Sequence, residues 1–381
     1  MRREPTTRNG RMAQGPILLA ERAVWRRPAR CAPALPVLAP PLLGALSLLG
    51  ALSLLAALFL LPALATAQSC ADVSPCIDQL HFGETRKARE IAAKVLGERG
   101  SRNAIPALAQ ALREDGGEFV RVNAAQALGR IGSEGSVAPL TQALKGDRRE
   151  LVRQMAAMAL GMVGQPQVVT PLTEALSADE SYAVRIQAAE SLGMVKDQRG
   201  LTFLMDALAN DARVEVRVAA ADALARLKLP ASAPTLITAL ASDQDHRVRV
   251  AVARALAMID AEGVAPALVK ALADDEARTV RQEAAKSLGM RRDGPALPQL
   301  ISTLKLDPAL EVRQEALFAL GRIGGDLAQS ALHYYRDNSV HDVIRRTARE
   351  ILAEPLPEPP QPRTPSSPTA QETASTRAFA P

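Results

Sequence analysis

The sequence predicts an all-α protein, a right-handed α-solenoid of about nine stacked helix pairs with a period of about 32 residues. Three observations carry this prediction: a Val-Arg dipeptide recurs at a constant spacing, a Leu-rich segment recurs before it, and an Asp recurs between the two. Only 3% of the 381 residues are aromatic, whereas 48% are hydrophobic, and these are largely Ala, Leu and Val. Such a composition is typical of closely packed helices. Self-similarity at a fixed period indicates a stack of structural repeats.

The Val-Arg dipeptide lies near the start of the second helix of each pair. We call its first residue the repeat valine. After Val184, small and apolar residues follow at four, five, seven and eight positions, which predicts one buried helical face. A Gly then recurs nine positions after the repeat valine, with Ala225 and Ala257 in its place in two repeats, and packing and helix termination would explain it. The series runs from Ala88-Arg89 through Val120-Arg121, Val152-Arg153, Val184-Arg185, Val216-Arg217, Val248-Arg249, Val280-Arg281 and Val312-Arg313 to Ile344-Arg345.

The Leu-rich segment predicts the first helix of each pair. Pro lies just before the marker Leu in six repeats, near the first helical turn, where a missing N–H is tolerated. Extending the register backward places Cys76 and Leu80 in an initial helix. The helix pairs are therefore expected from about residue 72 to 354. The marker residues are Leu108, Leu140, Leu172, Leu204, Leu236, Leu268, Leu300 and Leu332.

An Asp six residues before each repeat Arg lies in the turn between the two helices. Such an Asp can cap the following helix. It can also pair with the Arg of its own or of a neighbouring repeat, which would form a ladder of charge-assisted hydrogen bonds joining the repeats. Recurrence in equivalent copies indicates a structural role rather than an active site. The ladder residues are Asp115, Arg121, Asp147, Arg153, Asp179, Arg185, Asp211, Arg217, Asp243, Arg249, Asp275, Arg281, Asp307 and Arg313.

Residues 1–67 are expected to be a signal peptide. Eight Arg lie in this segment, an apolar stretch runs from Leu42 to Leu61, and Ala65-Thr66-Ala67 provides small residues for cleavage after Ala67. The alternative is an uncleaved N-terminal membrane anchor, because the apolar stretch is long enough to span a bilayer. Both alternatives export the body, to the periplasm or the medium or as a membrane-anchored protein. Contact with a membrane is expected only through an uncleaved leader.

The net charge of +5 belongs to the leader. Of the 46 Lys and Arg, eight lie there with two of the 41 acidic residues, which leaves 38 basic and 39 acidic side chains. A nucleic-acid partner is not expected, since it would require basic charge on the folded body.

Two cysteines remain after removal of the leader. In an exported chain, the pair Cys70 and Cys76 predicts one disulfide, with two free thiols as the alternative. Residues 68–354 would form the solenoid. Residues 355–381, rich in Pro, Ser and Thr, predict a disordered tail.

The pattern of Asp, Val-Arg, paired Ala and then Ala-Leu-Gly resembles HEAT repeats. Its shortness and regularity are most similar to the subclass named after phycobilisome lyases. The resemblance covers about three quarters of the chain. It implies the solenoid fold, but it does not imply one function, since that family includes lyases, hydroxylases and plain scaffolds.

Motifs for catalysis and for metal binding are not apparent. None of the four His is followed by Glu, whereas HEAT-like hydroxylases hold iron with repeated His-Glu pairs. His333 and His341 could approach each other in the last repeat. No cofactor is expected, and no catalytic or metal-ligating residue is assigned. The alternative function is a lyase-like or metal-binding enzyme, or an accessory subunit of one.

The position ten residues after the repeat valine is the candidate binding position. It is occupied by Arg130, Met162, Met194, Arg226, Met258, Met290 and Arg322. Flexible Met side chains suit adaptable binding surfaces, although each Met could instead fill a gap in the core. Second helices of HEAT-like pairs commonly line a concave face, so the sequence predicts an exported scaffold for a protein or peptide partner. The candidate partner-binding residues are Met155, Met158, Met162, Met194, Arg226, Met258 and Met290.

Overall fold

The computed structural model describes residues 72–358. Residues 1–67, Cys70 and residues 359–381 lie outside this range. The predicted cleavage, the disulfide and the disorder of the tail therefore stay predictions. Cys76 is buried in the first helix, as expected from its register. No helix within the described range is both long enough and apolar enough to cross a membrane.

Within residues 72–358, eighteen α-helices form nine consecutive pairs, which confirms the all-α solenoid. The first helices are α2 (Val73–Phe82), α4 (Ile105–Glu114), α6 (Val137–Gly146), α8 (Val169–Ala178), α10 (Leu201–Asn210), α12 (Ala233–Ser242), α14 (Val264–Asp274), α16 (Leu297–Leu306) and α18 (Asp326–Asn338). The second helices are α3 (Arg86–Arg99), α5 (Glu118–Ile131), α7 (Glu150–Val163), α9 (Tyr182–Val195), α11 (Val214–Leu227), α13 (His246–Ala257), α15 (Arg278–Arg291), α17 (Leu310–Ile323) and α19 (Asp342–Leu352).

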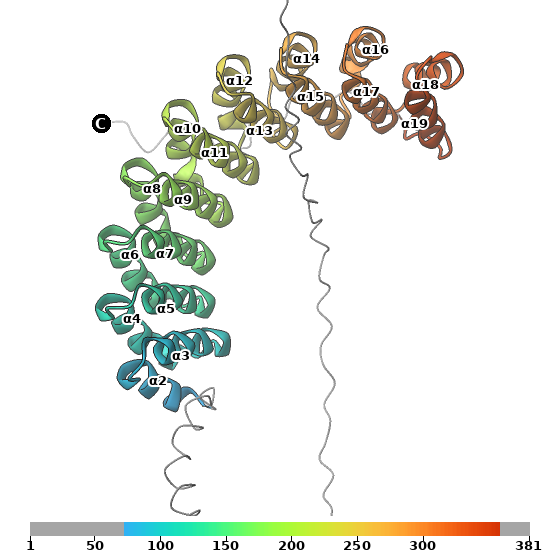
Figure 1. The fold of residues 1–381 in the computed structure, drawn as a ribbon. Coiled ribbons are helices and arrows are strands. Elements are labelled where there is room, and N and C mark those ends of the chain that lie inside the picture. Colours follow the sequence, from blue (N-terminus) through green and yellow to red (C-terminus); the bar gives the residue numbers. More distant parts are fainter. Residues whose placement is uncertain (1–71, 359–381) are drawn as a thin grey trace, which may run out of the picture. The chain divides into compact units, whose positions relative to one another are not determined.

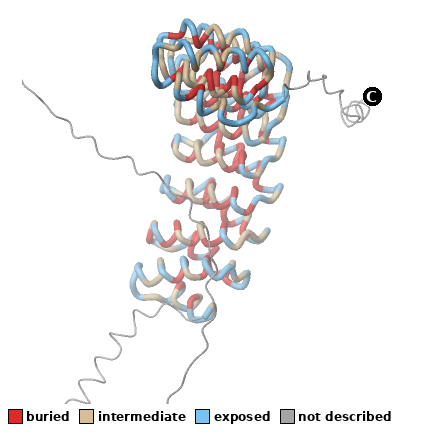
Figure 2. Tube along the Cα trace, turned by 90° about the vertical axis from the view of Figure 1, so that its right-hand side faces the viewer, coloured by how far each residue is buried: buried red, intermediate tan, exposed pale blue. Residues whose placement is uncertain are grey.

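The pairs follow one another in a curved row, with the second helices on its inner side (Figure 1). Buried residues recur at every level of the stack (Figure 2). The repeat valines and the marker leucines are fully buried, so each pair closes its own layer of the core. Successive second helices pack along their length, whereas successive first helices meet over fewer residues.

Close approach of the second helices depends on the Gly nine residues after the repeat valine. These residues lie inside the helices, so the expectation that they also terminate helices is wrong. A Cβ on Gly97 would lie 2.6 Å from Ala127 Cα, and one on Gly129 would lie 2.8 Å from Ala159 Cα. Because real Cβ atoms do not approach other atoms so closely, only Gly permits the spacing at these joints. Helices α11 and α13 instead carry Ala at this position. The second helices, on the inner side, pack more closely than the first helices on the outer side, and this difference curves the row.

The second helices end three residues later, on a left-handed residue that the sequence analysis missed. Gly occupies this position in four repeats, at Gly100, Gly132, Gly164 and Gly324. Lys196, Lys228 and Arg292 occupy it in three others, with φ values of 57°, 56° and 52°. A left-handed residue lets its N–H bond to a carbonyl at the end of the helix, as in Lys228 N–H to the Leu224 carbonyl oxygen.

The first helices begin after a short turn. A 3-10 turn precedes six of them, and Pro lies within the first three residues of seven. This placement confirms the expectation that Pro occupies the first turn. The turns are η2 (Arg102–Ala104), η3 (Glu134–Ser136), η4 (Pro166–Val168), η5 (Gln198–Gly200), η6 (Pro230–Ser232) and η7 (Gly294–Ala296).

The sixth repeat departs from this pattern. Helix α13 ends at Ala257, two residues before the equivalent position elsewhere, and Gly263 starts the next helix with a φ of 80°. Arg291 from the following second helix compensates: its side chain is buried and donates to the carbonyl oxygens of Leu256 and Ile259. The equivalent position in the other repeats from α5 to α17 carries Ile, Val or Leu, as in Ile259. Here the buried guanidinium satisfies carbonyls that the early end leaves open.

Candidate functional site

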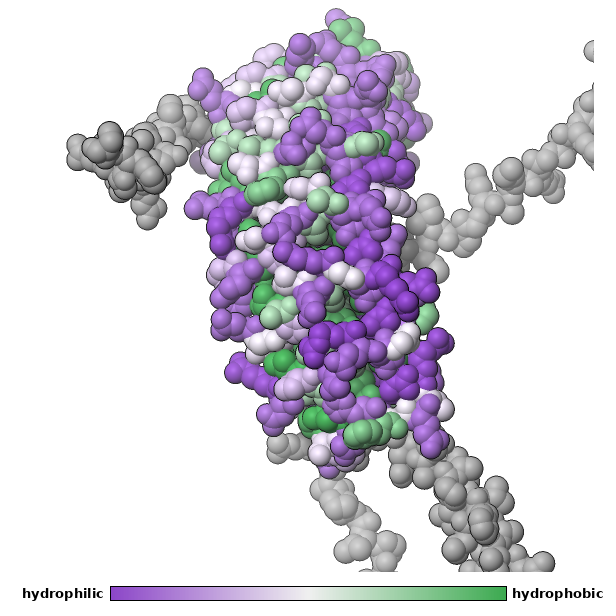
Figure 3. Space-filling view, turned by 90° about the vertical axis from the view of Figure 1, so that its left-hand side faces the viewer, coloured by the Kyte–Doolittle hydropathy of each residue, from purple (hydrophilic) through white to green (hydrophobic). Residues whose placement is uncertain are grey.

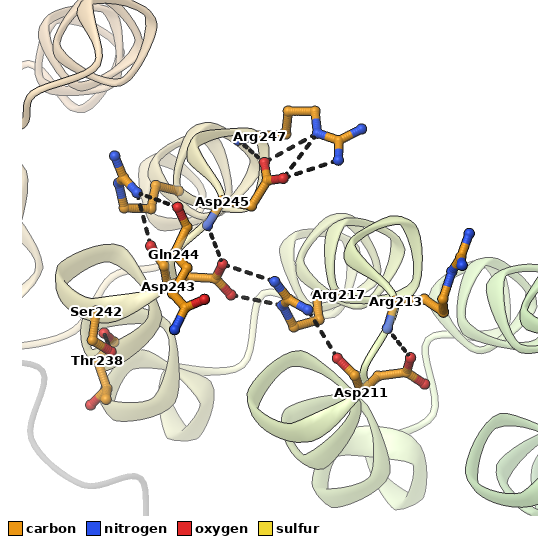
Figure 4. A network of polar contacts seen from close by, with 10 residues as sticks. Asp211, Arg213, Arg217, Thr238, Ser242, Asp243, Gln244, Asp245 and Arg247 are labelled. Carbon is orange, nitrogen blue, oxygen red and sulfur yellow. Dashed lines mark hydrogen bonds and ion pairs between the residues drawn. The ribbon is translucent and has the colours of Figure 1, made fainter.

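The charged ladder joins each repeat to the next. Arg217 donates from Nε to Asp243 Oδ2 at 2.8 Å and from Nη2 to Asp243 Oδ1 at 3.0 Å. It also donates from Nη1 to the carbonyl oxygen of Asp211, six residues before it, at 3.0 Å (Figure 4). The sequence left open whether Arg pairs within its own repeat. The structure places its ion pair in the neighbouring repeat and only its third bond in its own. Seven such pairs join Arg89–Asp115, Arg121–Asp147, Arg153–Asp179, Arg185–Asp211, Arg217–Asp243, Arg249–Asp275 and Arg281–Asp307.

Each ladder Asp has a second role in its own turn. Asp243 Oδ1 accepts the backbone N–H of Asp245 at 2.9 Å, and Asp211 Oδ1 accepts that of Arg213 at 2.8 Å. These N–H groups belong to the residue that precedes the second helix rather than to its first turn. The Asp therefore fixes the turn into the helix. One carboxylate thus sets both the local turn and the contact with the previous repeat.

The ladder is largely withdrawn from water. The side chain of Arg217 is 14% exposed and that of Asp243 is 8% exposed. The hydrogen bond to Asp243 raises the pKa of Arg217, and this effect outweighs partial burial, which lowers it. The guanidinium therefore stays charged. A bidentate pair of this kind fixes orientation as well as distance, so the ladder sets the angle between neighbouring repeats.

A free face remains on the second helices. At about 100° per residue, the positions three, six and ten residues after the repeat valine lie within about 60° of one another. Each second helix contacts its neighbours through position nine on one side and position seven on the other, as Gly129 on α5 does with Ala159 on α7. Positions three, six and ten lie between these two contacts, on the side away from the fully buried residues. On α7 these positions are Met155, Met158 and Met162, and on α9 the last of them is Met194. We call these four residues the methionine patch.

The outer methionines do not fill the core. Met162 and Met194 are 39% and 46% exposed, and Met258 and Met290 are 41% and 43% exposed. Met155 and Met158 are partly buried, and Met155 packs against core residues. The structure therefore places the candidate position at the edge of the core, open to solvent. Whether a partner binds there remains a prediction.

Polar and charged residues border the methionine patch on both sides. On α5 the equivalent positions include Arg130, whose Nη1 lies 4.0 Å from Glu98 Oε1 on α3, the second helix of the preceding pair. On α11, Arg226 is exposed, and its Cδ would lie 3.3 Å from a Cβ on Gly193. Arg226 therefore extends over the preceding repeat, beside Met194. The patch is an apolar surface with a charged rim.

The first helices present a different surface. The side drawn in Figure 3 is mostly hydrophilic, with scattered hydrophobic groups. Shallow cavities lie between successive first helices, and the ladder forms part of their walls. A cavity of about 610 Å³ beside α10 and α12 includes Arg217 and Asp243. A second, of about 410 Å³ beside α4 and α6, includes Arg121 and Asp147.

The histidines do not assemble into a site. His333 lies within α18, and His341 precedes α19, where its Nε2 lies 3.3 Å from Arg313 Nη1. Across residues 72–358, no group of three or more His, Cys, Asp or Glu side chains is arranged to hold a metal ion.

A family profile for HEAT repeats matches residues 73–161, 137–214, 201–289 and 275–353. These matches together span the whole stack of helix pairs. The chain belongs to the HEAT-repeat family. As a HEAT-repeat protein it has the fold of a common protein-interaction scaffold. A search of curated proteins finds no match.

Solved structures share the fold. One is Kap95p in complex with RanGDP, with 15% identity over 74% of this chain and 45% of that chain, and a TM-score of 0.53. Human deoxyhypusine hydroxylase gives 24% identity over 69% and 98% of the two chains, with a TM-score of 0.32. The CpcE–CpcF complex of phycocyanin lyase from Nostoc gives 22% identity over 75% and 96%, with a TM-score of 0.33. The similarity to Kap95p, at 15% identity, concerns the fold alone.

Proposed function

We propose that the protein is an exported, non-catalytic scaffold that binds a protein or peptide partner on the concave side of its solenoid. The observation that carries this proposal is the methionine patch, whose outer members Met162 and Met194 are exposed beside charged and polar residues. Met is flexible and polarizable, and Met-rich surfaces adapt to different partners. Exposed apolar groups rimmed by polar residues mark interaction sites.

The geometry favours an elongated partner. Equivalent positions recur on successive parallel helices, so a bound segment that runs along the row would meet the same position in each repeat. Met258 and Met290 continue the methionine series beyond Arg226. Arg254 bridges this region, with its Nη1 3.6 Å from Asp222 Oδ1 and its Nε 3.8 Å from Glu283 Oε1. A partner with apolar residues interrupted by charge would complement this order.

The binding proposal predicts that Met162→Gln and Met194→Gln together weaken partner capture about tenfold or more. Loss of a central apolar contact weakens binding by about 1–2 kcal/mol. The melting temperature should change little, because exposed substitutions alter stability by about 0.5 kcal/mol or less. The measurement is quantitative affinity capture from the envelope fraction, with mass spectrometry, beside a thermal melt of each variant.

The matched control is Phe203→Gln on α10. Phe203 is 41% exposed, like the methionines, but lies on a first helix. It should leave both capture and melting unchanged. The proposal fails if the methionine variant captures the same proteins with unchanged affinity. It also fails if binding falls only in proportion to the unfolded fraction, since the methionines would then act through stability.

Export rests on the leader and is tested separately. We expect the mature protein to begin at Gln68, because Pro62 ends the apolar segment and Ala65-Thr66-Ala67 offers a cleavage site. Mass spectrometry of the N-terminal peptide from fractionated cells measures this directly. Recovery in the membrane fraction of a chain that retains residues 42–61 would support the anchor. Recovery of the intact chain in the cytosol would contradict export.

A further inference from the structure

The last joint of the solenoid lacks its ladder carboxylate. Ser339 stands one full period after Asp307, whereas the Arg series continues through Arg313 to Arg345. Ser339 has φ −67° and ψ 136°, close to the −65° and 131° of Asp307. Its hydroxyl also takes over the bond within the turn, accepting the N–H of His341 at 3.2 Å. The backbone is thus formed as at the other joints, and only the charge is missing.

Arg313 is left without its usual partner. Its Nε donates to the carbonyl oxygen of Asp307 at 2.5 Å, a bond that the other ladder arginines make with Nη1. Its Nη1 lies 3.3 Å from His341 Nε2. Within residues 72–358 it forms no ion pair with a carboxylate, whereas the seven arginines before it in the series each form one with Asp. Of the Nε and Nη2 pair that holds Asp elsewhere, Nη2 has no bonded partner among these residues, and Nε becomes free once Nη1 takes over the bond to the Asp307 carbonyl oxygen, as at the other joints.

This guanidinium opens onto a cavity of about 590 Å³ between α16 and α18. The cavity is the counterpart of those beside α10 and α12 and beside α4 and α6, in which the Arg is neutralised by Asp. Here the walls include two cations, Lys305 and Arg313, and no Asp or Glu. An uncompensated pair of cations in a partly enclosed space attracts an anion.

The walls also indicate what accompanies the anion. Tyr335 is half-buried, and burial raises the pKa of its phenol, so the hydroxyl stays protonated and can donate. Apolar side chains form the rim: Leu327 is 52%, Tyr334 61% and Val340 85% exposed. Exposed apolar groups of this size beside a cationic cavity suit an anion carried between apolar residues.

We propose that this cavity binds an acidic side chain of a partner polypeptide, seated on Arg313 where the other joints seat the ladder Asp. The seven occupied joints show that this Arg position accepts a side-chain carboxylate presented by a polypeptide loop. Lys305 adds charge, and Leu327, Tyr334 and Val340 contact apolar residues next to the acidic one. This surface lies on the first helices and is separate from the methionine patch.

The test uses the full mature chain and a short peptide of Ala, Leu, Asp, Leu and Ala, acetylated and amidated so that Asp is its only carboxylate. Isothermal titration should show binding at least about tenfold tighter than that of the same peptide with Asn. Ser339→Asp should remove this preference, because it supplies the missing carboxylate in cis, and should raise the melting temperature. Ser339→Asn, the matched neutral variant, should retain the preference.

Arg313→Gln provides a second route if Ser339→Asp folds poorly. It should abolish the preference with only a small fall in melting temperature, since Arg313 loses its hydrogen bond to the Asp307 carbonyl oxygen but no ion pair. Equal affinity for the Asp and Asn peptides would overturn the proposal, as would a Ser339→Asp protein that binds like the wild type. Binding of an Asn peptide with a free C-terminus, without binding of the capped Asp peptide, would also overturn it. None of these outcomes depends on the methionine patch.

Discussion

Arg217→Ala should lower the free energy of unfolding by about 3 kcal/mol, because it leaves the buried carboxylate of Asp243 without its partner. It also removes a donor from the Asp211 carbonyl oxygen. Urea denaturation measures the loss. Hydrogen exchange should locate it in α11, α12 and α13, since each repeat of a solenoid contacts only its neighbours.

The same joint contains its own control. Arg247 pairs with Asp245 at 3.0 Å, but the Arg side chain is 55% exposed, so Arg247→Ala should leave the urea midpoint nearly unchanged. Arg217→Lys should be intermediate, because it keeps the charge and loses the fork. The double variant Arg217→Ala with Asp243→Ala should recover part of the loss, since no carboxylate remains buried and unpaired. Equal midpoints for Arg217→Ala and Arg247→Ala would show that the ladder does not hold the repeats together.

Gly129→Ala should destabilise the protein by about 2 kcal/mol. The added Cβ would lie 2.8 Å from both Cα and Cβ of Ala159, so α5 and α7 must separate. Overpacking of this kind costs up to about 3 kcal/mol, whereas Ala in place of Gly within a helix gains about 1 kcal/mol. The clash therefore prevails, and thermal or urea unfolding measures the difference.

Gly146→Ala is the matched change in open space. Gly146 is the last residue of α6, and an added Cβ there would meet nothing within 4 Å. Without a clash, only the gain in helix propensity remains, so this variant should be neutral or slightly stabilised. If both glycine variants were stabilised alike, the close approach of the second helices would not be what sets the spacing of the repeats.

The sequence alone was sufficient for the period, the helix pairs and the core. The apolar residues of one repeat define the buried faces of its two helices. Because these residues recur every 32 positions, the same two helices and the same core positions are expected in each repeat. The sequence was not sufficient for the partner of each Arg. Asp211 and Asp243 lie on either side of Arg217 in the sequence, and both separations recur with the same period. Only the packing of one pair on the next decides that Asp243 offers its carboxylate and Asp211 its carbonyl oxygen.

Two further features depended on local geometry. Gly at position nine could have ended a helix or admitted a neighbour, and the structure shows the second. The residues that do end the helices carried a usable signal, because Lys196, Lys228 and Arg292 continue the periodic series of Gly100, Gly132 and Gly164. Arg291 also stood out, as the charged member of an apolar series between Ile131 and Ile323. A buried side chain at that position implied an irregular neighbour, which is the early end of α13.

The candidate binding position could be located from the sequence but not assigned to surface or core. Met is apolar enough for the core and flexible enough for a surface, so the residue type does not decide between them. The packing of neighbouring second helices determines whether position ten is exposed. Each helix contacts its two neighbours through positions seven and nine, and position ten faces solvent between these contacts. Exposure of Met162 and Met194 follows from this placement.

Each ladder Arg that pairs with an Asp does so with the Asp of the next repeat and with no more distant one. The repeats that carry a complete Arg–Asp pair are therefore equivalent in how they join their neighbours. If the chain is cut after one ladder Asp and joined to the residue that follows another ladder Asp, whole periods are removed or added. The Arg before the new junction then pairs with the next Asp in the same geometry. Removing or duplicating a block of one full period would preserve each bridge that it does not contain. The number of repeats can therefore change in whole periods, except at the joint of α13 with α15, which depends on Arg291, and at the last joint, which lacks its Asp.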